Sequence, residues 1–571
     1  MEKEKRAQKA EAMPRKHRKL PWSYLLLAIF PGVSFFVFPA FSLYYQNTGE
    51  FTFGITAVAK AALIGCGASF LLLSTLAFLL PQKRALPVFS SLTFSLGLGL
   101  YVQYNFLNPA VGTLNGSPID WSAYASRGAL SLAFWIACLV LPLVLTLCWR
   151  PGGLRVLKGL SLFVTAVEAA TVIALVVTSP PVHLSDFSVT TEHALDVSDD
   201  NIVVFVMDTV DESVFQELRT TAPECAEDCL EDFVGFTNCV GGGSPTIFGL
   251  PLLLTGQPYE PTAYPRLPGY YDAYLTQAYG KCPLYQDLAQ NGYHIGLYTD
   301  SMFLQGCPEE LMQNFGYGTW YINNDKKFAA TLYKFCAFLT APQQLKPVFW
   351  CYTEEFAGFV TVKGYQGETC SCSSQNDHRF YQHLTQDGLA YCPGEKNYRF
   401  YHTMGAHDPY DLDEELQYAA GSTMEKKARG SFRLLQIYIQ QLKDLGVYDN
   451  TAIVVTADHG SRHEQAYANP MVMIKQKHHH GAYEENSAPI TFEQFPATVA
   501  SQFLEDYDAY GESYFDVTAD EYPDRTLTVH TPLLLQGHAI NSGYDPASNV
   551  VQFMFHGNVN DNRFEITGSY Q

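Results

Sequence analysis

The sequence predicts an N-terminal domain of five transmembrane helices, followed by an extracytoplasmic α/β domain with a mainly parallel central sheet. Two observations predict this organisation. Long apolar stretches fill the first 178 or so residues, and the rest of the 571-residue chain alternates β-branched runs with amphipathic segments. The charge changes at the same place, because basic residues outnumber acidic ones before residue 178 and acidic residues dominate after it. The two regions are therefore suited to different solvents.

Five apolar stretches each have about the ~20 residues that a bilayer-spanning helix needs. They lie at about 22–45, 53–80, 86–105, 128–148 and 157–178. The first stretch is long, follows a basic tail and precedes four more, which argues against a cleaved signal peptide. The predicted domains are a basic cytoplasmic tail (1–20), a transmembrane domain (21–178), a linker (179–200) and an extracytoplasmic domain (201–571).

Lys and Arg indicate the topology, since short cytoplasmic loops carry most of the positive charge. The N-terminal tail, "PQKR" and "WRPGGLRVLK" are basic, whereas the alternate loops contain almost no Lys or Arg. The N-terminus is therefore predicted inside, and the chain after about residue 179 outside. Trp121, Tyr101 and Tyr104 lie in or beside an outer loop. We expect these rings to act as interfacial anchors or to position a lipid headgroup.

The cysteines agree with an oxidising compartment, because ten of them lie outside the predicted spans. All ten could form disulfides, and the sequence does not give the connectivity. They are Cys225, Cys229, Cys239, Cys282, Cys307, Cys336, Cys351, Cys370, Cys372 and Cys392. A cysteine-rich metal site is the alternative, but the chain lacks two CxxC pairs with ribbon-like spacing.

The extracytoplasmic region alternates predicted strands and helices. Strand-like runs are "NIVVFVMD" (201–208), "HIGLYTD" (294–300), "RFYHTM" (399–404), "TAIVVTAD" (451–458) and "MVMIK" (471–475). A clear helical pattern covers 422–446, with Ser422 as a plausible N-cap and Gly446 as the terminator. Residues 320–398 show no clear periodicity and are interpreted as an insertion. Ligands of such sheets bind beyond the carboxyl ends of the strands.

Three residues with metal-ligating side chains stand at predicted strand ends. Asp208 ends the first strand, and Asp458 and His459 end a later one. Oxygen and nitrogen ligands of this kind suit Zn²⁺ or Mn²⁺, although an acid in this position can also simply cap the next helix. A fourth ligand could be a hydroxyl from "GGGSPTIFGLPLLLTG" (241–256). A nearby metal would make that alcohol a usable nucleophile, and a helix N-terminus would stabilise a phosphoryl oxyanion.

These motifs resemble a known superfamily. "NIVVFVMDT", "SPTIFGLPLLLTG", "GYHIGLYTD", "HTMGAH" and "TADHG" occur here in the order typical of the alkaline-phosphatase and sulfatase superfamily. The chain looks most like its membrane-anchored branch, the lipoteichoic acid synthases (phosphoglycerol transferases) and phosphoethanolamine transferases, which also have five N-terminal spans. The resemblance implies that 201–571 is a catalytic α/β domain of alkaline-phosphatase/sulfatase type.

The resemblance also implies a nucleophile. Aligning the sulfatase motif through Thr255-Gly256, or the transferase motif through Pro251, places Thr246 at the nucleophile position. The formylglycine of sulfatases is made from Cys or Ser, so a threonine disfavours an ordinary sulfatase. Ser244 is the alternative nucleophile, or the helix N-cap.

The remaining site residues follow from the same resemblance. It implies that one divalent metal ion, Zn or Mn, binds to Asp208, Thr246, Asp458 and His459. A second metal is possible. His402 and His407 of "HTMGAHDPY" match residues that contact the phosphate, and either could be the general acid to the leaving alkoxide. His463, four residues after His459, is a further candidate for substrate binding.

The sequence thus indicates a membrane-embedded enzyme with a phospholipid donor. We expect it to transfer a phospho-alcohol group, phosphoglycerol or phosphoethanolamine, to a cell-surface glycan or glycolipid through a phosphothreonine. One alternative is a sulfatase-like hydrolase or phosphodiesterase that uses the same site, and another is a non-catalytic membrane sensor or scaffold. The acidic extracytoplasmic domain has no basic stripe, which excludes a nucleic-acid partner.

Overall fold

The structure is a computed structural model with two compact units. It describes residues 22–46, 51, 53–81, 85–108, 119, 121–179, 187–226, 230–265, 269–317, 320–351, 355–356, 360–362, 369–370, 376–419, 421–460, 468–519, 523–530, 550–561 and 563–570. The first unit, called here the membrane unit, comprises Met1–Leu114, Pro118–Leu184 and Ile322–Val360. The second, called the α/β unit, comprises Asn115–Ser117, Ser185–Tyr321 and Thr361–Gln571.

In the part of the membrane unit that the structure describes, five helical segments are long and apolar enough to cross a membrane. These segments are Tyr24–Gln46, Ile55–Leu79, Ala85–Leu107, Ala125–Cys148 and Gly152–Thr178. Its elements are α2 (Trp22–Gly32), η1 (Val33–Val37), α3 (Phe38–Gln46), α4 (Ile55–Leu79), α5 (Ala85–Val102), η3 (Gln103–Leu107), η4 (Trp121–Tyr124), α6 (Ala125–Cys148) and α7 (Arg150–Thr178). Large apolar side chains such as Leu63 and Leu71 are exposed on them, as expected for helices that face lipid. The five predicted spans are confirmed.

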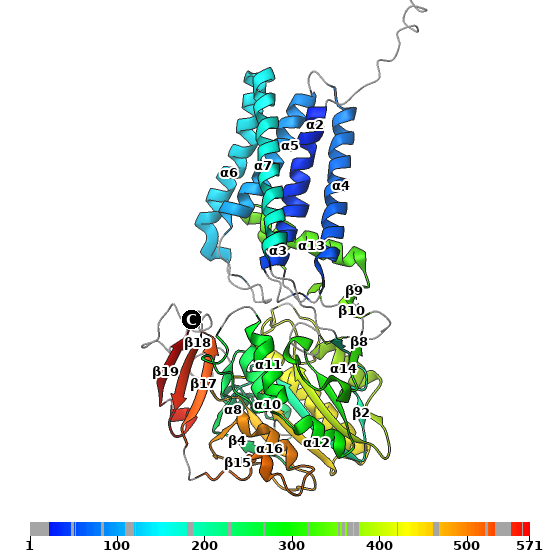
Figure 1. Ribbon diagram of the computed structural model, residues 1–571, viewed down its shortest axis with the longest axis vertical. Coiled ribbons are helices and arrows are strands. Elements are labelled where there is room, and N and C mark those ends of the chain that lie inside the picture. The colour runs from blue at the N-terminus through cyan, green and yellow to red at the C-terminus, as the bar shows by residue number, and fades with distance from the viewer. Residues whose placement is uncertain are drawn as a thin grey trace, which may run out of the picture. The chain divides into compact units, whose positions relative to one another are not determined.

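A segment from the middle of the chain also belongs to the membrane unit. It contains α13 (Asp325–Thr340) and η8 (Gln343–Phe349), and α13 contacts α3, α4 and η1 (Figure 1). The prediction assigned no substructure to 320–398 and therefore missed α13, although its buried residues Phe328, Leu332 and Phe335 recur at helical spacing.

A seven-stranded sheet forms the core of the α/β unit. Its order is β15-β4-β14-β13-β3-β12-β7, formed by Glu484–Asn486, Val234–Phe236, Val472–Lys475, Thr451–Thr456, Asp200–Met207, Lys396–Thr403 and Tyr293–Tyr298. Strands β13, β3, β12 and β7 are parallel, and β14 runs antiparallel to both of its neighbours. Strand β3 is buried along almost its whole length, which explains its continuous β-branched run. The predicted α/β class with a mainly parallel sheet is confirmed.

Helices cover this sheet. The longer ones are α8 (Glu212–Thr221), α10 (Thr246–Thr255), α11 (Tyr270–Gly280), α12 (Leu284–Gln290), α14 (Asp377–Gln386), α15 (Met424–Asp444) and α16 (Phe495–Ala500). Helix α15 begins one residue later than predicted, because the Thr423 hydroxyl accepts the Lys426 amide while the Ser422 hydroxyl donates to the Leu412 carbonyl. Gly446 follows the helix with a φ of 72°, as expected for its terminator.

Short elements complete the α/β unit. Two-stranded pairs are β1 (Phe187–Val189) with β8 (Phe315–Tyr317), β2 (Asp196–Val197) with β11 (Ala390–Tyr391), and β5 (Cys239–Val240) with β16 (Ile490–Thr491). Strand β9 (Trp320–Ile322), which reaches the unit boundary, pairs with β10 (Val360–Val362). The short helices are α9 (Pro223–Ala226), η6 (Ser301–Phe303), η7 (Glu309–Leu311), η11 (Phe492–Gln494), η12 (Asp508–Tyr510) and η13 (Val559–Asp561).

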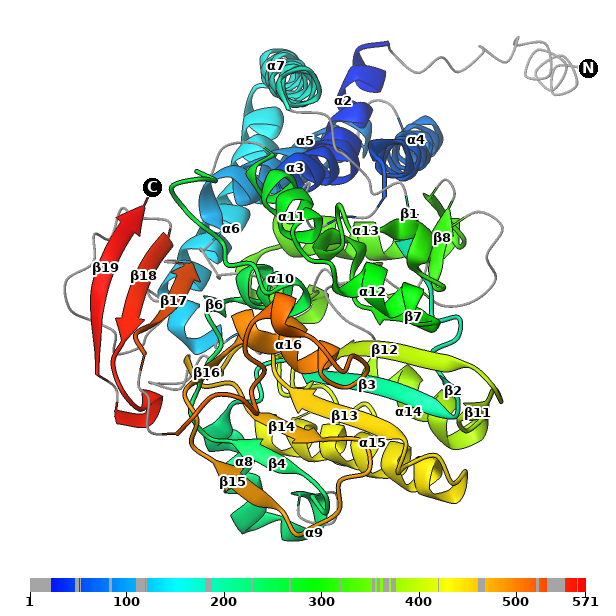
Figure 2. The same cartoon turned by 60° about the horizontal axis from the view of Figure 1, so that its bottom comes forward.

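The C-terminal strands form a second sheet that reaches the glycine-rich segment. Its order is β19-β18-β17-β6, formed by Phe564–Tyr570, Val550–Phe555, Arg525–His530 and Gly243–Ser244 (Figure 2). Strand β6 pairs in parallel with β17 through Gly243 and Ser244, directly before helix α10. The end of the chain therefore holds the turn that leads into α10.

The described cysteines are not disulfide-bonded. Seven of the ten cysteines outside the predicted spans carry no disulfide, namely Cys239, Cys282, Cys307, Cys336, Cys351, Cys370 and Cys392. The idea that all ten pair is therefore wrong for these seven, and the side chains of the other three lie outside the described part. Six of the seven are buried, so they serve as small apolar core residues.

Candidate metal and catalytic site

The predicted metal ligands converge at one edge of the large sheet. Strands β13 and β3 are parallel neighbours, so Asp208, Asp458 and His459 leave the sheet side by side. His459 Nε2 lies 3.7 Å from Asp208 Oδ1 and 3.4 Å from Asp458 Oδ2. The three possible ligand atoms all lie within 4.8 Å of one another, and all three residues are buried. Two acids and one imidazole, 250 residues apart in sequence, thus form one cluster.

Thr246 begins helix α10 beside this cluster. Its hydroxyl lies 3.4 Å from His459 Nε2, and the residue is 8% exposed. Ser244 lies in β6 and is buried, and the N-cap is Pro245 without a side-chain cap. The expectation that Ser244 could cap this helix is therefore wrong, because the chain is still in β-sheet pairing at residue 244.

Glycine at position 249 lets α10 approach the cluster. A Cβ atom on Gly249 would lie 2.1 Å from the carbonyl oxygen of Asp458, a distance no real Cβ tolerates. The helix therefore packs directly on the backbone of the second acid. This close packing fixes the Thr246 hydroxyl relative to Asp458 and His459.

The electrostatics of the cluster fit a divalent cation. Asp208 Oδ1 and Asp458 Oδ2 are buried and accept no hydrogen bond. Burial and the neighbouring charge of Asp208 raise the pKa of Asp458. Burial also opposes ionisation of Asp208, but His407, His402 and His459 outweigh it and hold the pKa of Asp208 well below its usual range. Two close carboxylates with unsatisfied oxygens, one imidazole and one hydroxyl form a suitable donor set for a metal ion.

His402 lies in strand β12, on the other side of β3 from Asp458. It is fully buried, with Nε2 3.7 Å from Asp208 Oδ2 and Nδ1 3.0 Å from the Thr299 hydroxyl. The structure therefore brings His402 to the same acid as His459.

His407 follows β12 in a loop. Its Nδ1 contacts the Asp408 carbonyl oxygen, and its side chain is 16% exposed. Its charge gives the largest of the pKa-lowering effects on Asp208. His407 thus lies closer to solvent than His402 yet still influences the cluster. His463 lies outside the described residues.

Two buried charged residues that the sequence did not reveal hold this loop. The Asp377 carboxylate accepts the amides of Met404 (2.8 Å) and Gly405 (3.2 Å). The Lys427 ammonium donates to the carbonyls of His407 (2.9 Å) and Pro409 (2.8 Å). Both residues are buried, since Asp377 is 2% exposed and Lys427 is 1% exposed. The sequence signal for this role was the position of Lys427, a charged residue on the buried face of the amphipathic helix α15.

Gly405 explains why this loop lies so close to Asp208. Its φ is 53°, and a Cβ atom there would lie 2.5 Å from both the amide nitrogen and the carbonyl oxygen of Asp208. The next amide, of Ala406, donates to that carbonyl oxygen at 2.9 Å. The loop that carries His407 is thus packed against the backbone of a predicted metal ligand.

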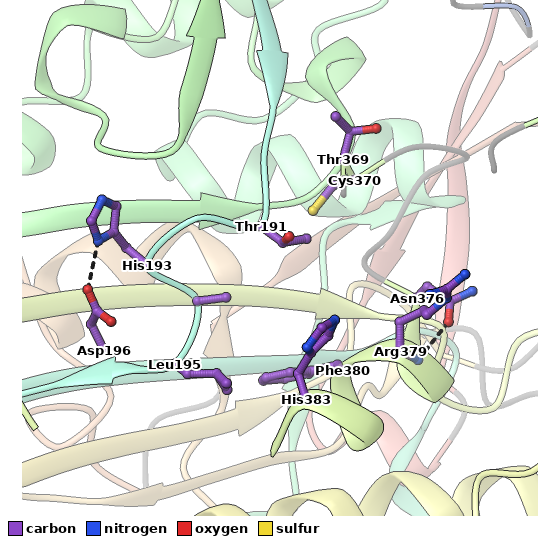
Figure 3. Close-up of a pocket in the computed structure, with 11 residues that line it drawn as sticks. Thr191, His193, Leu195, Asp196, Thr369, Cys370, Asn376, Arg379, Phe380 and His383 are labelled. Carbon is purple, nitrogen blue, oxygen red and sulfur yellow. Dashed lines mark hydrogen bonds and ion pairs between the residues drawn. The ribbon is translucent and has the colours of Figure 1, made fainter. Parts of the chain in front are cut away.

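A pocket of about 250 Å³ with a mainly apolar lining surface lies beside helix α14 (Figure 3). Its lining includes His193 and Asp196, which form an ion pair of 2.7 Å, and Arg379, Phe380 and His383 of α14. None of the predicted site residues lines it. The remaining lining residues are Thr191, Ala194, Leu195, Thr369, Cys370 and Asn376. Asn376, the N-cap of α14, directly precedes Asp377, the residue that accepts the amides of Met404 and Gly405.

Comparison with known proteins places this site in a family. No curated protein matches the chain. The lipoteichoic acid synthase LtaP from Listeria monocytogenes is 13% identical, over 58% of this chain and 78% of that chain, with a TM-score of 0.33. The periplasmic domain of EcEptC from Escherichia coli is 12% identical over 61% and 93%, with a TM-score of 0.30. Ps i-CgsB, in complex with k-i-k-neocarrahexaose, is 12% identical over 64% and 85%, with a TM-score of 0.41.

The sulfatase family matches residues 200–503, which run from β3, ahead of Asp208, to a point beyond Asp458 and His459. The match covers more than half of the chain and contains every predicted ligand. This protein is therefore a member of the sulfatase family.

Proposed function

We propose that this enzyme transfers a phospho-alcohol group, phosphoglycerol or phosphoethanolamine, from a membrane phospholipid to a cell-surface glycan or glycolipid. The family supports hydrolysis or transfer of phosphate or sulfate esters in general. The observation that carries the narrower proposal is Thr246, the first residue of α10, with its hydroxyl 3.4 Å from His459 Nε2. A threonine cannot supply the formylglycine of a sulfatase, but its hydroxyl can form a phosphoester.

The proposed reaction has two balanced steps. The Thr246 hydroxyl loses its proton to solvent and its oxygen bonds to the donor phosphorus. The bond from phosphorus to the diacylglycerol oxygen breaks, and protonated His407 gives that oxygen a proton. The acceptor hydroxyl then gives its proton to His407 and its oxygen bonds to phosphorus, while the phosphothreonine bond breaks and the Thr246 oxygen regains a proton from solvent. The first turn of α10 offers backbone amides to the phosphoryl oxygens in both steps.

A divalent ion, Zn or Mn, would be held by Asp208, Asp458, His459 and the Thr246 hydroxyl. Bound there, it would lower the pKa of that hydroxyl and stabilise negative charge on the phosphoryl group. His402, fixed by Thr299, would orient Asp208. A second metal would have to use His402 or His407.

The membrane unit supports a lipid donor, because a diacyl phospholipid does not leave the bilayer. The basic N-terminal tail and loops support a cytoplasmic N-terminus and an extracytoplasmic α/β unit. The pocket beside α14 supports a glycan acceptor. It combines hydrogen-bonding groups with a buried aromatic ring, Phe380, a combination that suits a sugar.

Mass spectrometry of Thr246 tests the proposal. The purified full-length protein is incubated with labelled phosphatidylglycerol or phosphatidylethanolamine, and the peptide that contains Thr246 is analysed. We expect a mass addition of the phospho-alcohol on Thr246, retained in Ser244→Ala and absent in Thr246→Ala. An unmodified Thr246 together with turnover of the lipid would rule out the phosphothreonine.

Hydrolysis is the second candidate, favoured by the family itself. Release of free phospho-alcohol at the same rate with and without a glycan acceptor would identify the protein as a phosphodiesterase. A protein that binds no metal and turns over no lipid would instead be a membrane sensor or scaffold.

A further inference from the structure

The segment 322–360 lies within the sulfatase-family match but packs with the membrane helices. The Tyr333 hydroxyl of α13 donates to the Ala61 carbonyl of α4 at 2.7 Å. The Tyr333 ring meets the Phe36 ring edge to face, with centroids 4.8 Å apart. On the same helix, the Leu339 carbonyl accepts from the Asn108 amide at 2.8 Å. Helix α13 therefore joins three of the five membrane-spanning segments.

These contacts lie inside the spans and not only at their ends. Ala61 is six residues from the start of α4 at Ile55, and Phe36 is ten residues from the end of α3 at Gln46. At 1.5 Å per residue, these positions are about 9 and 15 Å from the helix ends. Both helices are only 23 to 25 residues long as apolar spans. Helix α13 therefore reaches the depth at which the outer part of a hydrocarbon core begins.

The following segment, η8, is tied to the fourth span. Gln344 donates from its side-chain amide to the Gly128 carbonyl at 2.7 Å, and the Gln343 amide nitrogen donates to the Ser131 hydroxyl at 3.2 Å. The Ser131 hydroxyl in turn donates to Gln103 at 2.7 Å. Gly128 and Ser131 lie three and six residues into α6. Helix η8 is thus fixed beside the spans by backbone and side-chain hydrogen bonds.

Besides Gln344, the exposed side chains of η8 are apolar. Leu345 is 48% exposed and Val348 is 72% exposed. Beside them, α6 exposes Leu130 (61%) and Leu132 (48%), which flank the Ser131 that η8 contacts. The apolar surface of η8 is therefore continuous with the lipid-facing surface of a transmembrane helix.

Charged residues stand at the other end of the segment. Lys60, five residues into α4, pairs with Asp325 at 2.5 Å, and Lys326 and Lys327 follow on the exposed first turn of α13. The Trp121 ring contacts the Phe338 ring of α13, with centroids 6.2 Å apart. Segments that lie in a membrane interface typically combine lysines, which face the headgroups, with apolar side chains and an aromatic ring. Residues 325–350 show this combination.

We propose that residues 325–350 are embedded in the leaflet at which α3 ends and α4 begins. In this arrangement Leu345 and Val348 contact the acyl chains, and Lys326 and Lys327 contact the phosphates of phospholipids. The segment anchors the middle of the sulfatase-family sequence to the bilayer, independently of the linker after α7. The inference requires no particular reaction, so it does not depend on the proposed transferase activity.

Photocrosslinking tests this contact in the full-length protein. Benzoylphenylalanine replaces Val348, and the protein is irradiated in vesicles of phosphatidylglycerol and phosphatidylethanolamine. We expect a lipid adduct in the mass spectrum of the peptide that contains position 348. The same replacement of Leu130 is the positive control, and that of Tyr391, exposed in the α/β unit, is the aqueous control.

The yields of lipid adduct at the three positions test the proposal without an activity measurement. A yield of adduct at position 348 comparable to that at 130 supports it, and a yield as low as that at 391 overturns it. Leu345, on the same exposed surface, is tested in parallel in case the Val348 variant does not fold. Failure of this experiment leaves the mass addition at Thr246 unaffected, so the two proposals fail separately.

Discussion

The two units bury carboxyl groups in opposite ways. In the α/β unit, Asp208 lies within 3.7 Å of His402 and His459, and one of its buried oxygens accepts no hydrogen bond. In the membrane unit, Glu168 of α7 is fully buried, and it receives one hydrogen bond of 2.9 Å from Ser34. The first carboxylate is surrounded by basic groups, and the second has a neutral hydroxyl. A buried acid therefore indicates a metal or catalytic site only where further ligands converge on it.

Replacing an acid of the cluster should have the largest effect. In Asp458→Asn, the site loses one negative charge and one ligand, while the amide keeps nearly the same shape. We expect the bound metal to fall to background by elemental mass spectrometry and the turnover of lipid to fall by about 10³-fold or more. Circular dichroism should show an unchanged fold.

Glu212→Gln is the matched control, because Glu212 is also a buried acid of the α/β unit but lies outside the cluster. Burial raises the pKa of Glu212 to about 7, and its carboxylate accepts a hydrogen bond from Gln216. This variant should retain both metal and activity. Equal metal content in Asp458→Asn and the wild type would show that the cluster is not the metal site.

Much of this cluster follows from local sequence. Asp208 directly follows the buried strand β3, and Asp458 and His459 stand two and three residues after the buried strand β13. The order of parallel strands then brings these ends together. A helix after the glycine-rich turn was also predictable from the apolar run, but its start was not, because Pro245 and not Ser244 is the N-cap.

Other features depend on long-range packing. The pairing of β6 with β17 joins residues 243 and 528, and no local pattern indicates it. In the sequence, Asp377 looks like an ordinary acid in the first turn of a helix. Its role depends on the backbone of Met404 and Gly405, which only the fold brings next to it. Residues 322–360, a part of the predicted insertion 320–398, pack in the other unit, and no local pattern indicates this placement.

Asp377 allows a pH-dependent prediction. It tests the residue that holds the His407 loop without changing a predicted metal ligand. Burial raises its pKa to about 6 from an ordinary value of 3.8, against the lowering effects of Lys427 and the two amides. The folded protein therefore favours protonated Asp377. The stability that this protonated form contributes is fully present below about pH 4 and is lost as the pH rises through 6. A shift of about two units corresponds to about 3 kcal/mol.

Asp377→Asn removes this titration. The free energy of unfolding of the variant, relative to the wild type, should therefore rise by up to about 3 kcal/mol between pH 4 and pH 7. Thermal unfolding of both proteins over this range measures the difference, and the contributions of the metal ligands cancel. A difference that does not change with pH would show that Asp377 titrates normally.

The pocket beside α14 should affect the acceptor and not the donor. In His383→Ala and Arg379→Ala, the loss of one polar contact to a sugar should raise KM for the acceptor about tenfold. The rate of mass addition to Thr246 from the lipid should stay unchanged. Arg433→Ala, which removes an exposed arginine of α15, is the control. An equal slowing of the donor step would assign the pocket to the donor or to loop stability.

The smallest effect is expected at Glu168, the buried acid of the membrane unit. An ionised carboxylate is too costly in hydrocarbon without a counter-charge, and one of its oxygens accepts no hydrogen bond. Glu168→Gln keeps the shape and the bond from Ser34, so activity and the midpoint of thermal unfolding in nanodiscs should stay close to wild type. Ser34→Ala removes the only hydroxyl that donates to this carboxyl among the described residues, and should cost about 1–3 kcal/mol. If Glu168→Gln instead inactivated the enzyme as Asp458→Asn does, the membrane unit would hold an ionised functional carboxylate, and the contrast between the two units would fail.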